Sequence, residues 1–157
     1  MEIVNVRIDD RLIHGQVAGM WTGTLKATRI MVVDDEVIKD DLRKRMLKMA
    51  CPAGVKLSIL NCETAAQKVR DGQYEGDRIF VIVKSPATLL KMQSFGYPLS
   101  EVTVGNMSNR RGTRQIIKTI NVTEDDERQF RELADKGIRF YAQMVPSSDR
   151  ESFMEML

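Results

Sequence analysis

The feature that most constrains the fold is a short, wholly apolar run, Ile79 to Val83, between the charged residues Arg78 and Lys84. A strand that is apolar on both faces must be covered on both faces, which is typical of a parallel strand with helices above and below its sheet. Ser85-Pro86 follows at once, and this pair is typical of a helix N-cap followed by the first helical residue. The run therefore predicts a strand-helix unit in the middle of an α/β sheet.

The same succession of strand and helix patterns recurs along the whole chain. Segments that alternate or are rich in β-branched residues predict strands over residues 2–8, 29–34, 55–60, 78–84, 101–104, 115–120 and 139–145. Helical spacing of apolar residues predicts helices that begin near residues 16, 41, 62, 86, 123 and 148. We therefore predict an α/β fold with an open, mostly parallel sheet of about seven strands and helices on both faces.

Two local expectations follow from these patterns. In the helix that begins near residue 41, Leu42, Met46, Leu47 and Met49 fall near one face, which we expect to be buried. Strands 101–104 and 115–120 are joined by a loop instead of a helix, so they are expected to pair antiparallel and to make the sheet mixed at one edge.

Composition narrows the class of protein. A length of 157 residues with 43% apolar content suits one domain over residues 1–157. The net charge is +2 and no long basic run occurs, so bulk electrostatics favours neither nucleic acid nor a membrane. Cys51 and Cys62 are interpreted as reduced thiols, and a single histidine rules out a His/Cys zinc cluster of the usual spacing. No signal segment or bilayer-length apolar run is seen, so a cytoplasmic protein is expected.

The only histidine, His14, lies in the turn between the strand over 2–8 and the first helix. Such turns line the crevice at the carboxyl edge of an open sheet, and the following helix start offers free N–H groups to an anion. A neutral imidazole, with a reference pKa of ~6.5, is nucleophilic near neutral pH and can accept a phosphoryl group. His14 is therefore our candidate phosphoryl acceptor, and a purely structural histidine is the alternative.

The turn also holds candidates for the other tasks of phosphoryl transfer. Asp9, Asp10 or a turn carbonyl could orient the imidazole ring, and for Asp10 a solvated turn charge is an equal alternative. Arg11 brings a guanidinium whose geometry suits phosphate. The phosphate cradle is completed by backbone N–H groups at the helix start, which belong to Gly15, Gln16 and Val17.

Two further strand-end segments are candidates for the same crevice. Ser85 is a possible phosphate ligand, although a plain N-cap role is the stronger interpretation of this residue alone. The loop from Gly105 to Arg114 contains Arg110, Arg111 and Arg114, which could form a positive rim for an acidic partner or a donor phosphate. A solvated loop is an equally good interpretation of these arginines.

At this point the chain resembles a known family. Arg7 to Val17 reads Arg-Ile-Asp-Asp-Arg-Leu-Ile-His-Gly-Gln-Val, which is similar to the Arg-Ile-Asp-x-Arg-Leu-Ile-His-Gly-Gln-Val of IIB subunits in the mannose, fructose and sorbose family of the bacterial sugar phosphotransferase system. Val83 to Pro86, Val104 to Met107 and Gln143 to Pro146 also look like family segments. One departure is Asn106, where many members carry glycine.

The resemblance implies a role for the chain. His14 would take phosphate from a phosphohistidine on a IIA protein and pass it to a sugar entering through membrane subunits IIC and IID, while Arg11 neutralises the phosphoryl group. No cofactor or metal is needed, because a phosphohistidine is already an activated donor. The protein would be cytoplasmic and peripherally associated with the transporter, and a homo-oligomer is possible. Mannose, fructose, sorbose, glucosamine and N-acetylgalactosamine are all open as the sugar, with a slight lean to the last.

Two rival functions share features of this turn. A phosphatase with an Arg-His-Gly turn after its first strand is disfavoured, because that class uses a second histidine and this chain has none. The stronger alternative is a non-catalytic interaction module that binds an anion or a phosphorylated protein without turnover.

Overall fold

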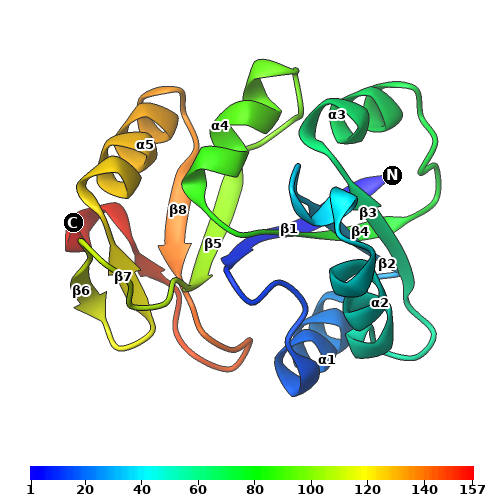
Figure 1. Cartoon of the computed structure of the whole chain (residues 1–157), viewed down its shortest axis with the longest axis horizontal. Coiled ribbons are helices and arrows are strands. Elements are labelled where there is room, and N and C mark those ends of the chain that lie inside the picture. The colour runs from blue at the N-terminus through cyan, green and yellow to red at the C-terminus, as the bar shows by residue number, and fades with distance from the viewer.

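The computed structural model describes residues 1–157 and confirms the alternation of strands and helices (Figure 1). The strands are β1 (Glu2–Asp9), β2 (Arg29–Val33), β3 (Lys56–Leu60), β4 (Arg78–Val83), β5 (Glu101–Asn106), β6 (Arg114–Ile117), β7 (Ile120–Val122), β8 (Arg139–Ala142) and β9 (Glu151–Ser152). The helices are α1 (Gly15–Leu25), α2 (Asp41–Ala50), α3 (Cys62–Arg70), α4 (Pro86–Ser94) and α5 (Glu124–Asp135), with short 3-10 helices η1 (Val37–Lys39) and η2 (Met154–Met156).

Seven strands form the main sheet in the order β3-β2-β4-β1-β5-β8-β9. Every pairing is parallel except that of β9 with β8. The apolar run of β4 lies between β1 and β2, as its composition predicts, and its residues from Ile79 to Val83 are buried. The predicted fold class, a mostly parallel sheet that is mixed at one edge, is confirmed.

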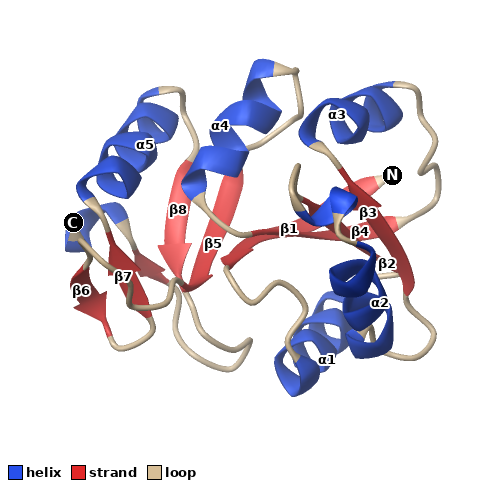
Figure 2. Ribbon diagram, viewed as in Figure 1, coloured by secondary structure: helices blue, strands red, loops and turns tan.

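Helices cover both faces of this sheet (Figure 2). One core joins strand residues to α3, α4 and α5 through side chains such as Ala65, Leu89 and Phe130. The smaller core lies under α1 and α2 and includes Trp21 and Leu47. This arrangement follows from connections that step along the sheet first in one direction and then in the other, as in doubly wound folds.

The segment 115–120 was predicted wrongly. It is not a strand of the main sheet, because a turn at Lys118 and Thr119 splits it into β6 and β7, which pair with each other antiparallel as a separate hairpin. The antiparallel edge of the main sheet is supplied by β9 instead. A two-residue turn of this kind lets adjacent strands pair locally, which costs less chain entropy than a long-range pairing.

The predicted terminal helix is also wrong. After β8 the chain forms a loop, the short strand β9 and then η2. Phe153 is fully buried against Phe130, with ring centroids 4.8 Å apart, and its N–H donates to the carbonyl of Phe140. Burial of one aromatic anchor and pairing with β8 therefore outweigh the weak helical spacing of this segment.

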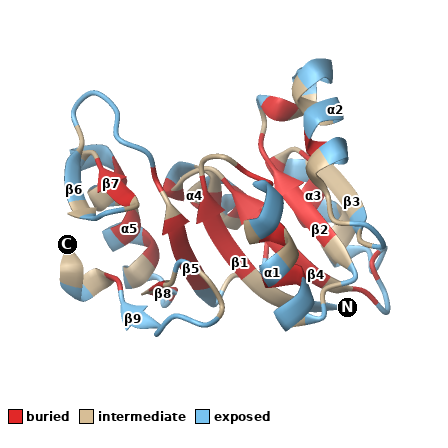
Figure 3. Ribbon diagram, turned by 90° about the horizontal axis from the view of Figure 1, so that it is seen from below, coloured by how far each residue is buried: buried red, intermediate tan, exposed pale blue.

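Helix α2 does not bury the face that its sequence suggests. Leu47 is buried, with 4% of its surface exposed, but Leu42, Met46 and Met49 are exposed at 62%, 55% and 86%. Figure 3 shows α2 at the periphery of the molecule with much of its length exposed. Because the sheet takes only the Leu47 side of the helix, the other three apolar side chains meet solvent.

Candidate functional site

The sheet order brings three loops to one edge. Strand β1 pairs in parallel with β4 through Ile8 and Val83, and with β5 through Ile8 and Val104. The segments that leave these three strands therefore start side by side at the carboxyl edge (Figure 1). This is the place where ligands bind in open α/β sheets, and the predicted site segments after β1, β4 and β5 do meet there.

The turn between β1 and α1 is tightly built. The carboxylate of Asp9 accepts the backbone N–H of Arg11 at 3.0 Å, and the Leu12 N–H donates to the carbonyl of Asp9. Leu12 has a φ of 62° and is buried, a left-handed conformation that costs a non-glycine residue about 1 kcal/mol. The packing of this leucine side chain holds the turn in place and sets the entry into α1.

His14 occupies the N-cap position of α1 in an extended conformation, and its side chain is exposed. The ring makes no hydrogen bond and does not cap the helix, and the first turn of α1 holds no acidic residue. The first N–H groups of a helix have no partner within it, so those of Gly15, Gln16 and Val17 stay available. The predicted anion cradle is therefore open beside the histidine.

Arg11 and Asp9 form a two-point ion pair. The Nε and Nη2 of Arg11 donate to the two carboxylate oxygens of Asp9 at 3.0 and 2.9 Å. This hydrogen bonding raises the pKa of Arg11 above its ordinary value. Because Asp9 is buried while the Arg11 side chain is about one third exposed, the guanidinium is held rigidly but still reaches solvent at the turn.

Arg7 is a site residue that the sequence analysis missed. Its guanidinium is 2% exposed, donates from Nη1 to the carbonyl of Gln143 and lies 5.2 Å from the ring of Trp21. Its Nε lies 3.6 Å from Asp9, and neither Nε nor Nη2 makes a hydrogen bond. Burial lowers the pKa of Arg7, and a small pocket shared with His14 and Val17 reaches it. The detectable signal was a charge in the second half of β1, between the buried residues Val6 and Ile8.

Gly105 explains how that guanidinium fits into the sheet. A Cβ atom at this position would come within 2.1 Å of the Cζ of Arg7. Any larger residue at position 105 would push the guanidinium of Arg7 out of its present place. The buried position of Arg7 therefore requires glycine at position 105.

Asp10 joins the histidine turn to the segment after β5. Its carboxylate accepts from the Asn106 side chain at 2.9 Å, and from the N–H and hydroxyl of Ser108 at 2.7 and 3.0 Å. Neither Asp9 nor Asp10 bonds to the His14 ring. Asp10 thus links the histidine turn to the segment after β5. Asn106, which stands where many family members carry glycine, has Asp10 as its hydrogen-bond partner.

Ser85 stands at the N-cap position of α4, but its hydroxyl makes no capping hydrogen bond. The first turn of α4 also lacks an acidic residue. Helix α4 follows β4, the neighbour of β1, so a second uncapped helix start lies at the same edge as that of α1. The predicted N-cap position of Ser85 is therefore confirmed, but its hydroxyl does not cap the helix.

The three loop arginines differ in their contacts. Arg110 forms an ion pair with Asp126, and Arg114 forms one with Glu127, so α5 carboxylates balance both charges. Arg111 is exposed and makes no ion pair. The positive rim expected from the sequence is thus reduced to one unpaired guanidinium.

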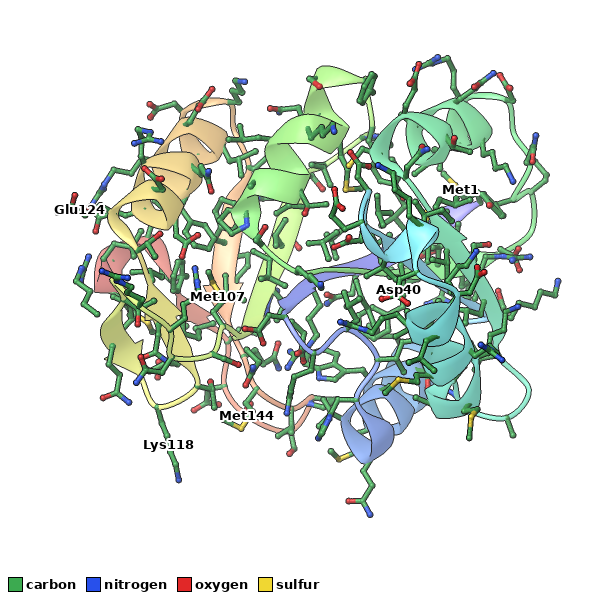
Figure 4. All side chains as sticks on the ribbon, in the orientation of Figure 1. Met1, Asp40, Met107, Lys118, Glu124 and Met144 are labelled. Carbon is green, nitrogen blue, oxygen red and sulfur yellow. The ribbon has the colours of Figure 1, made fainter.

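The loop after β8 closes the site from the other side. The Nε1 of Trp21 donates to the carbonyl of Met144 at 3.2 Å, and the neighbouring carbonyl of Gln143 binds Arg7. Figure 4 shows Met144 in this loop and Met107 just after β5. A cavity of about 450 Å³ lies elsewhere, between the amino ends of β1 and β5, and includes none of the site residues.

Fold and site together define an α/β protein whose one histidine sits at an open helix start beside two arginines, a class of site suited to phosphate. Residues 3–157 match the family described as the sorbose subfamily IIB component of the phosphotransferase system (PTS). The chain belongs to this family and is a phosphotransfer component of a sugar phosphotransferase system. The resemblance seen in the sequence is confirmed.

Individual relatives agree with this family. The fructose-specific EIIB component of Bacillus subtilis (strain 168) is 35% identical over 157 residues, covering 100% of this chain and 96% of that protein. The sorbose-specific EIIB component of Lacticaseibacillus casei is 37% identical over 152 residues, covering 95% and 93%. The crystal structure of the IIB domain of the Klebsiella pneumoniae sorbose permease superimposes with a TM-score of 0.94 at 31% identity, covering 99% of this chain and 96% of that one.

Proposed function

We propose that His14 accepts a phosphoryl group from a phosphohistidine on a IIA protein and donates it to a sugar during uptake. The observation that carries this proposal is the exposed, unbonded imidazole at the uncapped start of α1. A nucleophilic nitrogen is thus placed where backbone N–H groups can bind the oxygens of the transferring group.

The transfer needs two displacements at phosphorus. A ring nitrogen of His14 bonds to phosphorus as the N–P bond of the donor breaks, and the donor imidazole keeps the electron pair. The sugar hydroxyl oxygen then bonds to phosphorus as the N–P bond at His14 breaks, and the freed ring nitrogen keeps the electron pair and takes up the hydroxyl proton. In both steps negative charge is spread over the phosphoryl oxygens, so catalysis rests on positioning and charge stabilisation.

The remaining site residues take supporting roles in this proposal. Arg11 neutralises the phosphoryl group through the part of its guanidinium not bound to Asp9, and the N–H groups of Gly15, Gln16 and Val17 bind its oxygens. Ser85 offers a hydroxyl and a second uncapped helix start nearby. Asp10 acts as a positioning residue through Asn106 and Ser108. Arg111 is the arginine best placed to meet an acidic partner, because Arg110 and Arg114 are already paired.

The proposed partners are those of a sugar phosphotransferase system. They are a IIA phosphocarrier, the IIC and IID membrane subunits, and the sugar, with the whole chain 1–157 acting as one IIB domain at the membrane transporter. The mannose-specific relative of Escherichia coli (strain K12) is a EIIAB component, of which this chain covers 49%, and this supports a IIA partner. Relatives of the chain are named for fructose, sorbose, mannose and N-acetylgalactosamine, and transport assays with each sugar would identify the substrate.

The decisive test is phosphoryl labelling. Incubation with phosphoenolpyruvate, the general phosphotransferase proteins and a cognate IIA should produce an acid-labile, base-stable adduct on His14. The variant His14→Ala should accept no phosphate and keep an unchanged thermal melt. If the wild-type protein stays unlabelled while a control IIB is labelled, the protein is a non-catalytic anion-binding module. Loss of folding in His14→Ala would make the histidine structural.

A further inference from the structure

Helix α2 carries an apolar stripe that no other part of the chain covers. Leu42, Met46 and Met49 follow one another at intervals of four and three residues, so they lie along one side of the helix. All three are more than half exposed, and Leu47 faces away from them into the core. Helix α2 therefore has two apolar sides, one buried in the core and one facing solvent.

The stripe is bordered by cations without partners. Helix α2 contains four basic residues and one acidic residue, Asp41, which pairs with Lys44 at 3.3 Å. Arg43, Arg45 and Lys48 form no ion pair. On α5, in contrast, Arg128 and Arg131 are each paired with a carboxylate of the same helix. The surface around the α2 stripe is locally positive although the whole chain has a net charge of only +2.

The charge and the size of the α2 stripe indicate which kind of partner can bind it. A second copy of the same face would bring like charges together, which opposes self-association. A helix of ten residues is about 15 Å long, and one stripe on it falls far short of the ~800 Å² per partner of a specific protein interface. An apolar stripe flanked by lysine and arginine is instead typical of a helix that lies in a membrane interface.

We propose that α2 binds an anionic bilayer surface, with Leu42, Met46 and Met49 entering the headgroup region and Arg43, Arg45 and Lys48 facing lipid phosphates. Helix α2 is too short to span a membrane, and no helix of this structure is long and apolar enough to do so. The contact is peripheral, reversible and dependent on salt. It does not rest on the proposed chemistry at His14.

The place of α2 relative to the phosphate site follows from the sheet. Helices α1 and α2 cover the same face of the sheet and both follow parallel strands, so their amino ends lie toward its carboxyl edge (Figures 2 and 4). Figure 4 marks the α2 amino end at Asp40. The start of α2 and the histidine turn therefore lie toward the same edge of the sheet.

Vesicle flotation of the intact protein tests this proposal. The wild-type protein should float with vesicles of phosphatidylcholine mixed with phosphatidylglycerol at low salt, and should be released at high salt. It should not float with phosphatidylcholine alone. Failure to float with the anionic vesicles at low salt would overturn the proposal.

Two exposed variants separate the contributions of charge and stripe. Arg45→Gln with Lys48→Gln should weaken partitioning about 30-fold, since each cation near an anionic surface contributes about fivefold. The triple variant Leu42→Ser, Met46→Ser, Met49→Ser should abolish flotation. Arg128→Gln on α5 with Lys136→Gln at its C-cap removes the same charge and should leave flotation unchanged. These α2 sites are exposed, so a melt should confirm an intact fold.

The labelling assay separates this proposal from a protein-docking role. Both α2 variants should accept phosphate from soluble IIA at the wild-type rate, because the substituted side chains are exposed and none of them lines the pocket beside His14. If they float normally but accept phosphate more slowly, α2 is a docking face for IIA and the lipid proposal is wrong. Equal losses in the α5 control would also overturn it, because binding would then follow total charge.

Discussion

The starts of α1 and α5 differ in their capping hydrogen bonds and in the acidic residues of their first turns. Helix α5 begins with a capping box in which Thr123 accepts the N–H of Asp126 at 3.0 Å and Asp126 accepts the N–H of Thr123 at 2.9 Å. Its first turn holds four acidic residues. Helix α1 begins with an unbonded His14 and no acid. One start has its N–H groups and dipole satisfied internally, whereas the other leaves them for a ligand.

The contrast extends to the other helices. Asp40 caps α2 and Asn61 caps α3, and each helix has an acidic residue in its first turn. Only α1 and α4 lack both features, and they follow the neighbouring strands β1 and β4. The two uncapped starts thus coincide with the candidate site, as the proposed anion site requires.

After the complete loss expected for His14→Ala, the largest effect is expected from Arg11→Ala, which removes the side-chain cation of the turn before α1. Phosphoryl transfer should slow about 100-fold, the usual cost of losing one preorganised donor. Arg11→Lys should recover only part of the rate, because lysine lacks the fork that holds Asp9. Quench-flow labelling measures the rates, and equal transfer by wild type and Arg11→Ala would remove this arginine from the mechanism.

A smaller effect is expected from making α1 resemble α5. Gln16→Glu places a carboxylate in the first turn of α1, where it competes with phosphate for the helix start. Phosphate acceptance should fall about tenfold, while the free energy of unfolding rises by about 0.5 kcal/mol because the acid complements the dipole. Gln67→Glu, at an exposed site on α3, is the matched control and should leave the rate unchanged. A variant with normal transfer would show that the α1 start does not bind the phosphoryl group.

Removing the cap of α5 tests whether this cap contributes to the free energy of unfolding and not to phosphoryl transfer. Thr123→Ala removes the side-chain acceptor of the capping box and should lower the free energy of unfolding by about 1 kcal/mol. Phosphate acceptance should stay at the wild-type rate. Urea unfolding measures the first quantity and labelling the second, and a slower rate would link α5 to the site.

The smallest effect on stability is expected from Ser85→Ala. Because the Ser85 hydroxyl caps nothing, the free energy of unfolding should change by only a few tenths of a kcal/mol, whereas Asn61→Ala should cost about 1 kcal/mol. Phosphate acceptance by Ser85→Ala should fall several-fold if the hydroxyl contacts the phosphoryl group. If Ser85→Ala lowered the free energy of unfolding as much as Asn61→Ala, the Ser85 hydroxyl would be a helix cap.

Much of the fold could be predicted because its signals are local. The apolar run in β4, the caps at Asn61 and Thr123 and the strand-turn-helix around His14 are all encoded within a few residues. The errors arose where local spacing was weak. The segment 115–120 was split by a turn, and the segment after 146 was held by one buried phenylalanine.

The site was only partly predictable for the same reason. His14, Arg11 and the helix N–H groups are neighbours in sequence, so one motif revealed them together. The contacts of Asp10 with Ser108 span 98 residues, and that of Arg7 with Gln143 spans 136. No local pattern indicates which distant loop a side chain will meet.

By itself the sequence determined the alternation of strands and helices from β1 to β5 and the placement of its one histidine between the first strand and the first helix. Hydrophobic periodicity and capping act over a few residues, so they can be read directly. The tertiary structure decided which strands are neighbours, which helix starts remain uncapped at the shared edge, and which side of α2 faces solvent. These outcomes depend on long-range packing, because a side chain is buried or exposed only after distant elements have docked.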